Sequence, residues 1–352
     1  MKIALLTIWH CWNYGAELQT YATVRKLQEM GHEVEVIDFR LQEQQKRTSL
    51  LGRVSDFMHN CAPVSRKFNR FWKRYISSTK HYLSLDELRK DPPRADLYLV
   101  GSDQVWNPQI TGKKAAAYFL EFAPDNAELA SYASSFGTDK WLGDEEITEI
   151  ATRQLNKFKG ISCREKQGCD ILKETFHLDA VHVIDPSLLH GSYPELTGKI
   201  KPQKTLAYYQ LSESPQLMEF AKRKAEELGL RFVDVNHQSQ ITSTFSWNRR
   251  SVGHWIKAIA ESEFVITHSF HGLAMSILYH RPFVVIYNSG NKISRLVSLL
   301  HLAGLENRLF TTIEDARHSS VWSESIDYQE VDEHLTKARE SSIDYLRRIS
   351  QK

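Results

Sequence analysis

Short apolar runs alternate with amphipathic stretches along most of the chain. The first run, Ile3–Ile8, predicts a strand. The stretch after it predicts a helix, because its apolar residues recur at helical spacing (Leu18, Tyr21, Val24 and Leu27). A further apolar run at 34–37 predicts the next strand. Since these runs are almost continuously apolar, we expect parallel strands that are buried on both faces.

The same alternation continues in two series. It predicts strands at 96–100, 129–133, 160–164 and 181–184 in the first half, and at 205–209, 232–235, 264–266 and 282–286 in the second. A stretch rich in Gly, Pro and Lys, at about 191–204, separates the two series. We therefore predict an α/β protein with two Rossmann-like, doubly wound domains, at residues 1–195 and 204–327, which face a cleft. An amphipathic helix at 328–352 is expected to pack back on the first domain.

Residues 40–90 differ from the rest of the first series in charge. Twelve Lys and Arg side chains face only four acidic ones there, and aromatic residues are interleaved with them. The pattern predicts a helical insertion. Two interpretations stay open: a solvated pair of basic helices, or a surface that meets anionic lipid or a diphosphate-bearing acceptor.

Overall composition narrows the class of protein. Lys and Arg number 45 and Asp and Glu 43, and this balance argues against a nucleic-acid partner. No run reaches the roughly 18 apolar residues of a membrane span. The four cysteines lie outside metal-site spacings, so we expect reduced thiols, no bound metal and a cytoplasmic protein. Peripheral contact with the inner face of the membrane through 40–90, and a homo-oligomer, are left open.

The richest candidate chemistry follows the strand at 264–266. Ser269, His271 and Gly272 lie where this strand gives way to a helix. Backbone N–H groups and the helix dipole favour an anion at such a point, and His suits proton transfer near neutral pH. The alternative is a histidine that caps the helix and is satisfied by its neighbours.

Three further groups of candidates follow other strands. Asn13, Gly15 and Gln19 lie at a helix start, where the glycine permits close backbone approach; the alternative is a simple turn. Arg164 presents a planar fork suited to carboxylate or phosphate, with Ser162 as a hydroxyl donor. The alternative for Arg164 is an ion pair with an acid such as Glu165.

The segment at 101–107 supplies a candidate base and a candidate stacking surface. Asp103 is the candidate base, and Trp106 is the candidate platform for a sugar ring. The alternative is a capped turn with a core tryptophan. The chain contains no G-x-S-x-G, Walker A or H-E-x-x-H motif, and the loop at 13–15 lacks G-x-G-x-x-G, which argues against a classical dinucleotide site.

Taken together, several segments resemble the polysaccharide pyruvyl transferase family over about residues 1–310. The resemblance rests on the segments at 13–22, 101–108, 134–137, 162–165, 185–189 and 269–272. It implies a two-domain GT-B fold and transfer of pyruvate from phosphoenolpyruvate onto two sugar hydroxyls, with phosphoenolpyruvate as donor substrate and no cofactor. It also implies that Arg164 holds the donor's carboxylate or phosphate and that His271 takes part in donor binding and acid/base work.

We therefore expect a pyruvyl transferase that forms a ketal on a saccharide in surface polysaccharide biosynthesis. The expected partner is a saccharide acceptor, and a free and a lipid-linked form are both left open. The alternatives are a GT-B glycosyltransferase that uses a nucleotide sugar, and a non-catalytic saccharide-binding relative. Both would use the same type of cleft.

Overall fold

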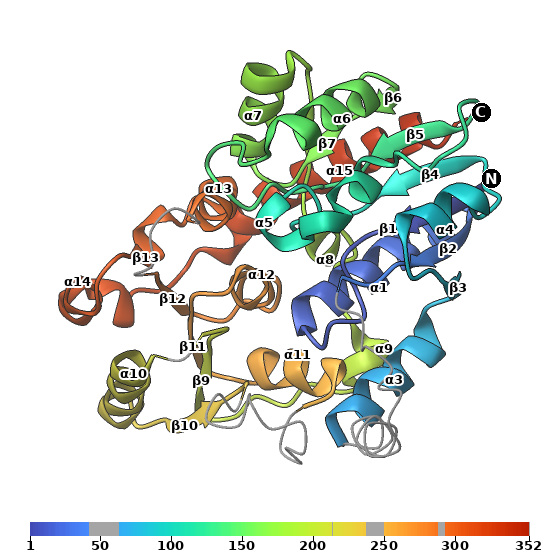
Figure 1. Ribbon diagram of the computed structural model, residues 1–352. Coiled ribbons are helices and arrows are strands. Elements are labelled where there is room, and N and C mark those ends of the chain that lie inside the picture. The colour runs from blue at the N-terminus through green and yellow to red at the C-terminus, as the bar shows by residue number, and fades with distance from the viewer. Residues whose placement is uncertain (42–62, 213, 237–249, 288–292, 352) are drawn as a thin grey trace, which may run out of the picture.

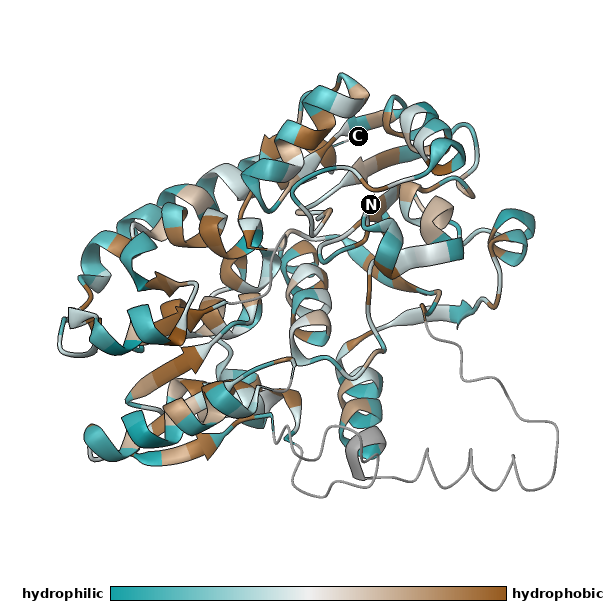
Figure 2. Cartoon of the chain, turned by 60° about the vertical axis from the view of Figure 1, so that its left-hand side comes forward, coloured by the Kyte–Doolittle hydropathy of each residue, from teal (hydrophilic) through white to brown (hydrophobic). Residues whose placement is uncertain are grey.

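The structure of the chain is a computed structural model that describes residues 1–41, 63–212, 214–236, 250–287 and 293–351. Two parallel sheets form its framework (Figure 1). The hydrophobic positions of the chain concentrate in the strands of both sheets, and the outward sides of the helices are largely hydrophilic (Figure 2). This is the arrangement that the apolar runs predict.

The first sheet has six strands in the order β3-β2-β1-β4-β5-β6, all of them parallel. The strands are β1 (Lys2–Leu6), β2 (Glu33–Asp38), β3 (Ser78–His81), β4 (Leu97–Val100), β5 (Glu128–Ser131) and β6 (Phe158–Gly160). The helices of this part are α1 (Tyr14–Glu29), α3 (Pro63–Tyr75), α4 (Leu85–Lys90), α5 (Pro108–Thr111), α6 (Glu145–Leu155), α7 (Lys166–Phe176), α8 (Pro186–Leu189) and α9 (Pro194–Thr197), together with the 3-10 helix η1 (Gly112–Phe119).

A short second layer lies beyond the carboxyl ends of the first sheet. Strands β7 (Ser162–Cys163) and β8 (Val181–His182) pair with each other in parallel. Single bridges join Asp103 to Ser134, and Ser134 to Cys163. These bridges connect the loops after β4 and β5 to β7, so they bring Asp103 and the end of β7 to one edge of the fold.

The second sheet has five parallel strands in the order β10-β9-β11-β12-β13. The strands are β9 (Thr205–Tyr209), β10 (Arg231–Asp234), β11 (Phe264–Thr267), β12 (Phe283–Ile286) and β13 (Leu309–Phe310). The helices are α10 (Pro215–Glu227), α11 (Val252–Ala260), α12 (Phe270–Leu278), α13 (Ser294–Ala303), α14 (Ile313–His318) and α15 (Tyr328–Ile349), with the 3-10 helices η3 (Glu306–Arg308) and η4 (Ser320–Trp322). The α/β class and the two Rossmann-like units are therefore confirmed.

The described part of the basic segment, at 40–41 and 63–90, contains a strand as well as two helices, so its prediction as a helical insertion is correct there only in part. Residues 42–62 lie outside the described part. After them come α3, the strand β3 and the helix α4, and β3 pairs with β2 to form the edge of the first sheet. The sequence of β3, Ser-Thr-Lys-His, is polar, and three of its four residues are exposed. An exposed edge strand of this kind lacks the apolar pattern of a buried strand.

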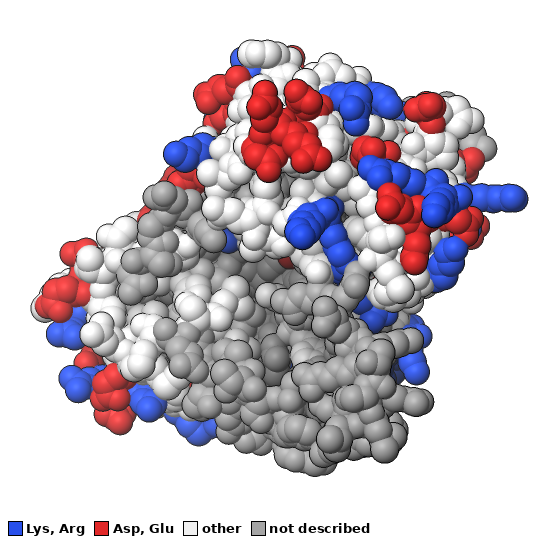
Figure 3. Space-filling model, viewed as in Figure 1, with Lys and Arg blue, Asp and Glu red and all other residues white. Residues whose placement is uncertain are grey.

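Helix α3 is amphipathic, and its apolar side packs on α1. Phe68 stacks on Tyr14 with ring centroids 5.5 Å apart, and Phe71 lies 5.8 Å from Tyr21. The opposite side carries exposed Arg66, Arg70, Lys73 and Arg74. On the face of the molecule shown in Figure 3, by contrast, basic and acidic side chains lie next to one another.

The C-terminal helix α15 crosses from the second sheet to the first. Its Tyr345 hydroxyl donates a hydrogen bond to the Ser131 carbonyl at 2.8 Å, and the buried Ser342 hydroxyl accepts one from the Ile184 amide at 2.9 Å. Helices α1, α8 and α12 lie between the two sheets (Figure 1), and α8 contacts both of the others. No helix of the described ranges is long and apolar enough to cross a bilayer.

The attachment of α15 to the first domain makes a measurable contribution to stability. Replacing Ser342 with alanine leaves the buried Ile184 amide without an acceptor, and such a loss costs roughly 1–3 kcal/mol. We expect the free energy of unfolding, measured by urea denaturation, to fall by this amount. The exposed neighbour Ser341→Ala is the matched control and should change stability by less than about 0.5 kcal/mol. Equal effects of the two substitutions would contradict the role of Ser342.

Candidate active site

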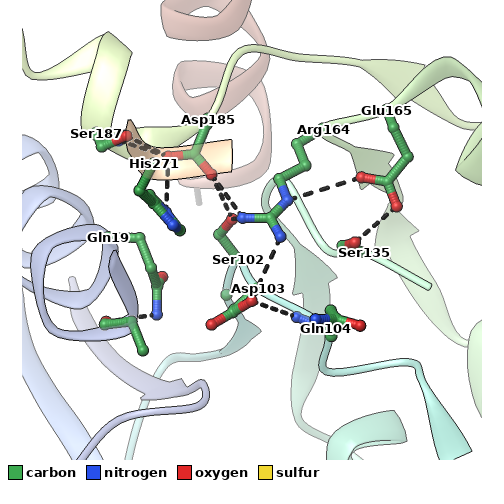
Figure 4. Close-up of polar contacts among 12 residues, drawn as sticks. Gln19, Ser102, Asp103, Gln104, Ser135, Arg164, Glu165, Asp185, Ser187 and His271 are labelled. Atoms are coloured by element: carbon green, nitrogen blue, oxygen red, sulfur yellow. Dashed lines mark hydrogen bonds and ion pairs between the residues drawn. The ribbon is translucent and has the colours of Figure 1, made fainter. Parts of the chain in front are cut away.

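A buried arginine lies at the centre of the candidate site (Figure 4). Arg164 follows β7, and its side chain has no exposed surface. Its guanidinium lies 2.9 Å from Asp185, 3.3 Å from Asp103 and 3.7 Å from Glu165. Ion pairing by neighbouring acids, the alternative that the sequence left open, therefore occupies this side chain. A fully buried guanidinium requires such neutralisation, because an unpaired charge in a protein interior is very costly.

Asp185 links several parts of the site. As the N-cap of α8, it accepts hydrogen bonds through Oδ1 from the amide and the hydroxyl of Ser187, at 2.9 and 2.6 Å. Its Oδ2 accepts from Arg164 and from the Ser102 hydroxyl. Burial raises the pKa of Asp185, but His271, Arg164 and the bonded Ser187 outweigh this effect and hold the pKa below its usual value. The carboxylate is therefore charged at neutral pH.

His271 reaches this cluster from the second domain. It lies in the first turn of α12, and its Nε2 is 3.9 Å from Oδ1 of Asp185. Within the described ranges this buried Nε2 has no hydrogen-bond partner. Burial lowers the pKa of His271; the attraction of Asp185 opposes this, while Arg164 adds to it, and the net pKa is below the usual value. The imidazole is therefore mainly neutral at pH 7.

The start of α1 fits closely against the His271 ring. A Cβ atom added to Gly15 would lie 2.0 Å from Nδ1 of His271, so only glycine fits at this position. From the other side, the Phe270 ring lies 4.6 Å from the Arg164 guanidinium carbon. The N-termini of α1 and α12 therefore meet around the histidine, and Arg164 and His271 belong to one site.

A second arginine, Arg295, faces the same cluster from the start of α13. Its Nε is buried and has no hydrogen-bond partner, and among the described residues no carboxylate lies within ion-pair distance of its side chain. Burial and repulsion from Arg164 lower its pKa. An arginine keeps its charge in such a setting, so Arg295 brings a fixed positive charge that the described part of the protein leaves uncompensated at close range.

The remaining predicted residues lie nearby but have structural partners. The Asn13 side chain accepts from the amides of Gly15 and Ala16 and caps α1, and Ser269 caps α12 by accepting from the Gly272 amide. The Gln19 amide donates to the Thr7 hydroxyl and the Ile8 carbonyl. These three side chains shape the two helix starts.

Asp103 is the partly exposed carboxylate of the cluster. Its side chain is 16% exposed, which distinguishes it from the fully buried Asp185. Its backbone has a left-handed φ of 73°, and Oδ1 accepts from the Gln104 amide. Asp103 therefore faces the site with an oxygen that solvent or a ligand can reach.

The prediction that Trp106 and Ser162 contact a ligand is wrong. Trp106 has no exposed surface, its indole N–H donates to the Tyr118 carbonyl, and its ring stacks on Phe119, so it is a core residue rather than a sugar platform. The Ser162 hydroxyl is also buried and is engaged by the Ser131 carbonyl and the Ala133 amide. Ser162 therefore joins β7 to β5 and does not serve as a donor to a ligand.

The sequence did not reveal Arg295 and Asp185 as site residues, nor the burial of the acid Glu17. Glu17 is fully buried in α1, where its carboxylate accepts from the amides of His10 and Cys11 and from the Trp72 indole at 2.5 Å. Burial raises its pKa to about 7, despite these hydrogen bonds. In the described ranges no group of three His, Cys, Asp or Glu side chains could hold a metal ion.

Comparison with known proteins adds a family and a fold. The model of the family described as polysaccharide pyruvyl transferase matches residues 13–290. A provisionally assigned UDP-N-acetylglucosamine 2-epimerase from Listeria monocytogenes has a similar structure, with 12% identity, a TM-score of 0.51, and coverage of 96% of this chain and 91% of that one. The UDP-GlcNAc 2-epimerase from Neisseria meningitidis, bound to UDP-GlcNAc, has 10% identity and a TM-score of 0.49, with coverage of 100% of this chain and 95% of that one. The likeness to the Listeria protein shows the two-domain GT-B fold. No curated protein matches the sequence significantly.

Removing the central arginine should destabilise the protein in a pH-dependent way. In an Arg164→Met variant, Asp103, Glu165 and Asp185 lose their shared cation, and breaking such a buried pair costs about 3–5 kcal/mol. In the wild type the lowered pKa of Asp185 adds stability above its unfolded pKa, and this contribution is lost as pH falls. Without Arg164 that pKa rises, so protonation at lower pH relieves the variant.

Thermal unfolding at neutral pH and at about pH 5 tests this prediction. The difference in Tm between wild type and Arg164→Met should be largest at neutral pH and should shrink at the lower pH. Arg223→Met, which removes an exposed arginine of α10, is the control and should leave Tm nearly unchanged. If the Tm of Arg164→Met is lower than that of the wild type by the same amount at both pH values, repulsion among the carboxylates is excluded as the cause.

Proposed function

Because the chain belongs to the polysaccharide pyruvyl transferase family, we propose that it transfers pyruvate from phosphoenolpyruvate onto two hydroxyls of a saccharide. The product is a cyclic ketal on a precursor of a surface polysaccharide, and phosphate is released. One observation carries the proposal: Arg295 and His271, from the second domain, face the Arg164 cluster at the meeting point of two helix N-termini.

Donor binding requires fixed positive charge, because phosphoenolpyruvate is strongly anionic. Three carboxylates already surround Arg164, so its role is to hold the site together and to contribute through space. Arg295 is free to pair with a carboxylate or a phosphate in the fork-like manner of a guanidinium. The N-termini of α1 and α12 add partial positive charge to the same place.

The chemistry needs one proton donor and one proton acceptor. A proton adds to the methylene carbon of the donor, and a saccharide hydroxyl oxygen then bonds to the neighbouring carbon. A second hydroxyl bonds to that carbon as its bond to the phosphate oxygen breaks. The two hydroxyls lose one proton each. One of these replaces the proton that the methylene carbon took up when it became a methyl group, and the other leaves with the phosphate. General acid/base groups within reach typically accelerate such steps by about 10²–10⁴-fold.

His271 and Asp103 are the side chains placed to move these protons. An anion bound beside His271 raises the pKa of its imidazole, and the imidazolium so formed can protonate the methylene carbon. Asp103 has an accessible carboxylate that can accept a hydroxyl proton. The acceptor saccharide reaches the site from the cytoplasm or from a lipid carrier at the inner face of the membrane. The exposed cations of α3 support the second route.

An activity assay tests the donor and the roles of both second-domain residues. Wild-type protein, incubated with phosphoenolpyruvate and a panel of saccharides, should release phosphate and add the mass of a ketal to one acceptor. His271→Gln should lower kcat by about 10²–10⁴-fold, because it removes acid/base catalysis. Arg295→Ala should raise KM for phosphoenolpyruvate by about 10–100-fold, the loss of one or two charge-assisted hydrogen bonds.

Exposed residues of the second domain provide the matched controls. His280→Gln and Arg317→Ala should leave both constants unchanged. If phosphoenolpyruvate gives no turnover and no thermal stabilisation while UDP or GDP stabilises the protein, a nucleotide-sugar glycosyltransferase replaces the present proposal.

Donor binding should be accompanied by proton uptake. The pKa of His271 is lowered in the free protein, so the imidazole is neutral at pH 7, and the negative charge of the donor raises this pKa. Affinity for phosphoenolpyruvate should therefore fall as pH rises through the pKa of the complex. Calorimetric titration in two buffers of different ionisation enthalpy measures the protons taken up. The His271→Gln variant shows how many protons the donor itself takes up. Equal uptake by variant and wild type would refute the assignment of the proton to His271.

A further inference from the structure

Helix α7 begins without a cap from its own N-cap residue. The first N–H groups of an α-helix have no acceptor inside the helix, and the N-cap side chain usually supplies one. Glu165, the N-cap of α7, does not. Its Oε1 accepts from the Ser135 hydroxyl at 2.7 Å and from the Phe136 amide at 3.2 Å, and its Oε2 lies 3.7 Å from Arg164 (Figure 4). The carboxylate that would cap α7 is therefore part of the cluster around Arg164.

A serine of the second domain accepts from α7 instead. The Ser298 hydroxyl, in α13, accepts from the amide of Lys166, the first residue of α7, at 3.2 Å. The same oxygen lies 3.4 Å from Nε2 of His182, in β8. That Nε2 is also 3.3 Å from the Arg164 carbonyl oxygen, and because a carbonyl can only accept, Nε2 carries the proton. Ser298 therefore accepts from two segments of the first domain.

The same helix brings Arg295 to the active site. Arg295 and Ser298 are three residues apart in α13, a spacing that places two side chains on one side of a helix. Leu296 and Leu300 are buried on another side of it. Helix α13 contacts α7 of the first domain (Figure 1). The contact of Ser298 therefore determines how far the start of α13, with Arg295, lies from the Arg164 cluster.

Arg295 needs such a contact, because its own surroundings do not hold it in place. Its Nε is buried without a hydrogen-bond partner, and burial is the main cause that lowers its pKa. Loss of hydration opposes a charged group in this position, so withdrawal of the side chain toward water would relieve that cost. Hydrogen bonds from the first domain to Ser298 oppose the withdrawal by holding the helix that carries Arg295.

We propose that Ser298 is a positioning residue, which caps α7 across the domain interface and thereby holds Arg295 at the Arg164 cluster. The capped amide directly follows Arg164 and Glu165 in the chain, so the cap also fixes the segment that carries both of these residues. Anion binding at Arg295 and the contact between α13 and α7 should therefore favour each other. The proposal rests on the proposed function only in assigning Arg295 to anion binding.

Hydrogen–deuterium exchange, followed by mass spectrometry, tests the cap. Ser298→Ala removes the acceptor of the Lys166 amide, so peptides that span the start of α7 should exchange about two- to tenfold faster. Ser298→Thr keeps the hydroxyl and should keep the wild-type rate. Ser214→Ala, which removes the N-cap hydroxyl of α10 within the second domain, is the matched control and should leave these peptides unchanged. Wild-type exchange in Ser298→Ala would overturn the proposal.

Calorimetric titration with inorganic phosphate tests the position of Arg295 without requiring turnover. Ser298→Ala should weaken phosphate binding about two- to tenfold, whereas Ser298→Thr and Ser214→Ala should bind it as the wild type does. In an Arg295→Ala background, Ser298→Ala should add less than about twofold, because the guanidinium that it positions is gone. An equal effect with and without Arg295 would overturn the proposal, and so would a wild type that binds no phosphate.

Turnover of phosphoenolpyruvate separates this proposal from the proposed function. Ser298→Ala should raise KM by about two- to tenfold and leave kcat within about twofold, since Ser298 does not touch the reacting atoms. If Ser298→Ala turns over the donor with wild-type KM, the role of Ser298 fails and the proposed function stands. If the wild type does not turn over phosphoenolpyruvate but phosphate binding depends on Ser298 as expected, the proposed function fails and the role of Ser298 stands.

Discussion

The neutralisation of Arg164 is the constraint on which the rest of the site depends. A guanidinium with no exposed surface persists only if carboxylates surround it, and here they come from the loop after β4, from the residue next to the arginine and from the N-cap of α8. Meeting this requirement joins three segments at the carboxyl edge of the first sheet. The bridges between Asp103, Ser134 and Cys163 hold two of these segments, the loop after β4 and the end of β7, through the backbone.

The second domain is positioned against this edge by contacts of a different kind. Glycine at position 15 allows the start of α1 to touch the His271 ring, and Phe270 covers the Arg164 guanidinium. Asp185 lies between the two and contacts both Arg164 and His271. Because one carboxylate faces the arginine of the first domain and the histidine of the second, the relation of the domains and the charge state of the site depend on each other.

Much of the fold could be predicted from the sequence, since buried parallel strands appear as short, continuous apolar runs. The strand β3 could not, because an exposed edge strand lacks that pattern. Arg164 and His271 were recognisable because each follows a strand at the edge where parallel sheets bind ligands. Trp106 and Ser162 follow strands as well, but which side of a loop faces the core depends on packing between distant segments. Arg295 is distant in sequence from the other site residues, and only the tertiary fold brings it to Arg164.

The two domains bring charge of opposite sign to the site. The first-domain side holds three carboxylates and one arginine, so it is negative, whereas the second domain contributes Arg295 and a histidine that can take up a proton. Arg295 has no carboxylate within ion-pair distance among the described residues, so an anion can pair with it without first displacing one. Preorganised charges of this kind stabilise a developing negative charge without having to rearrange, and this is the main way in which enzymes lower barriers of anionic reactions.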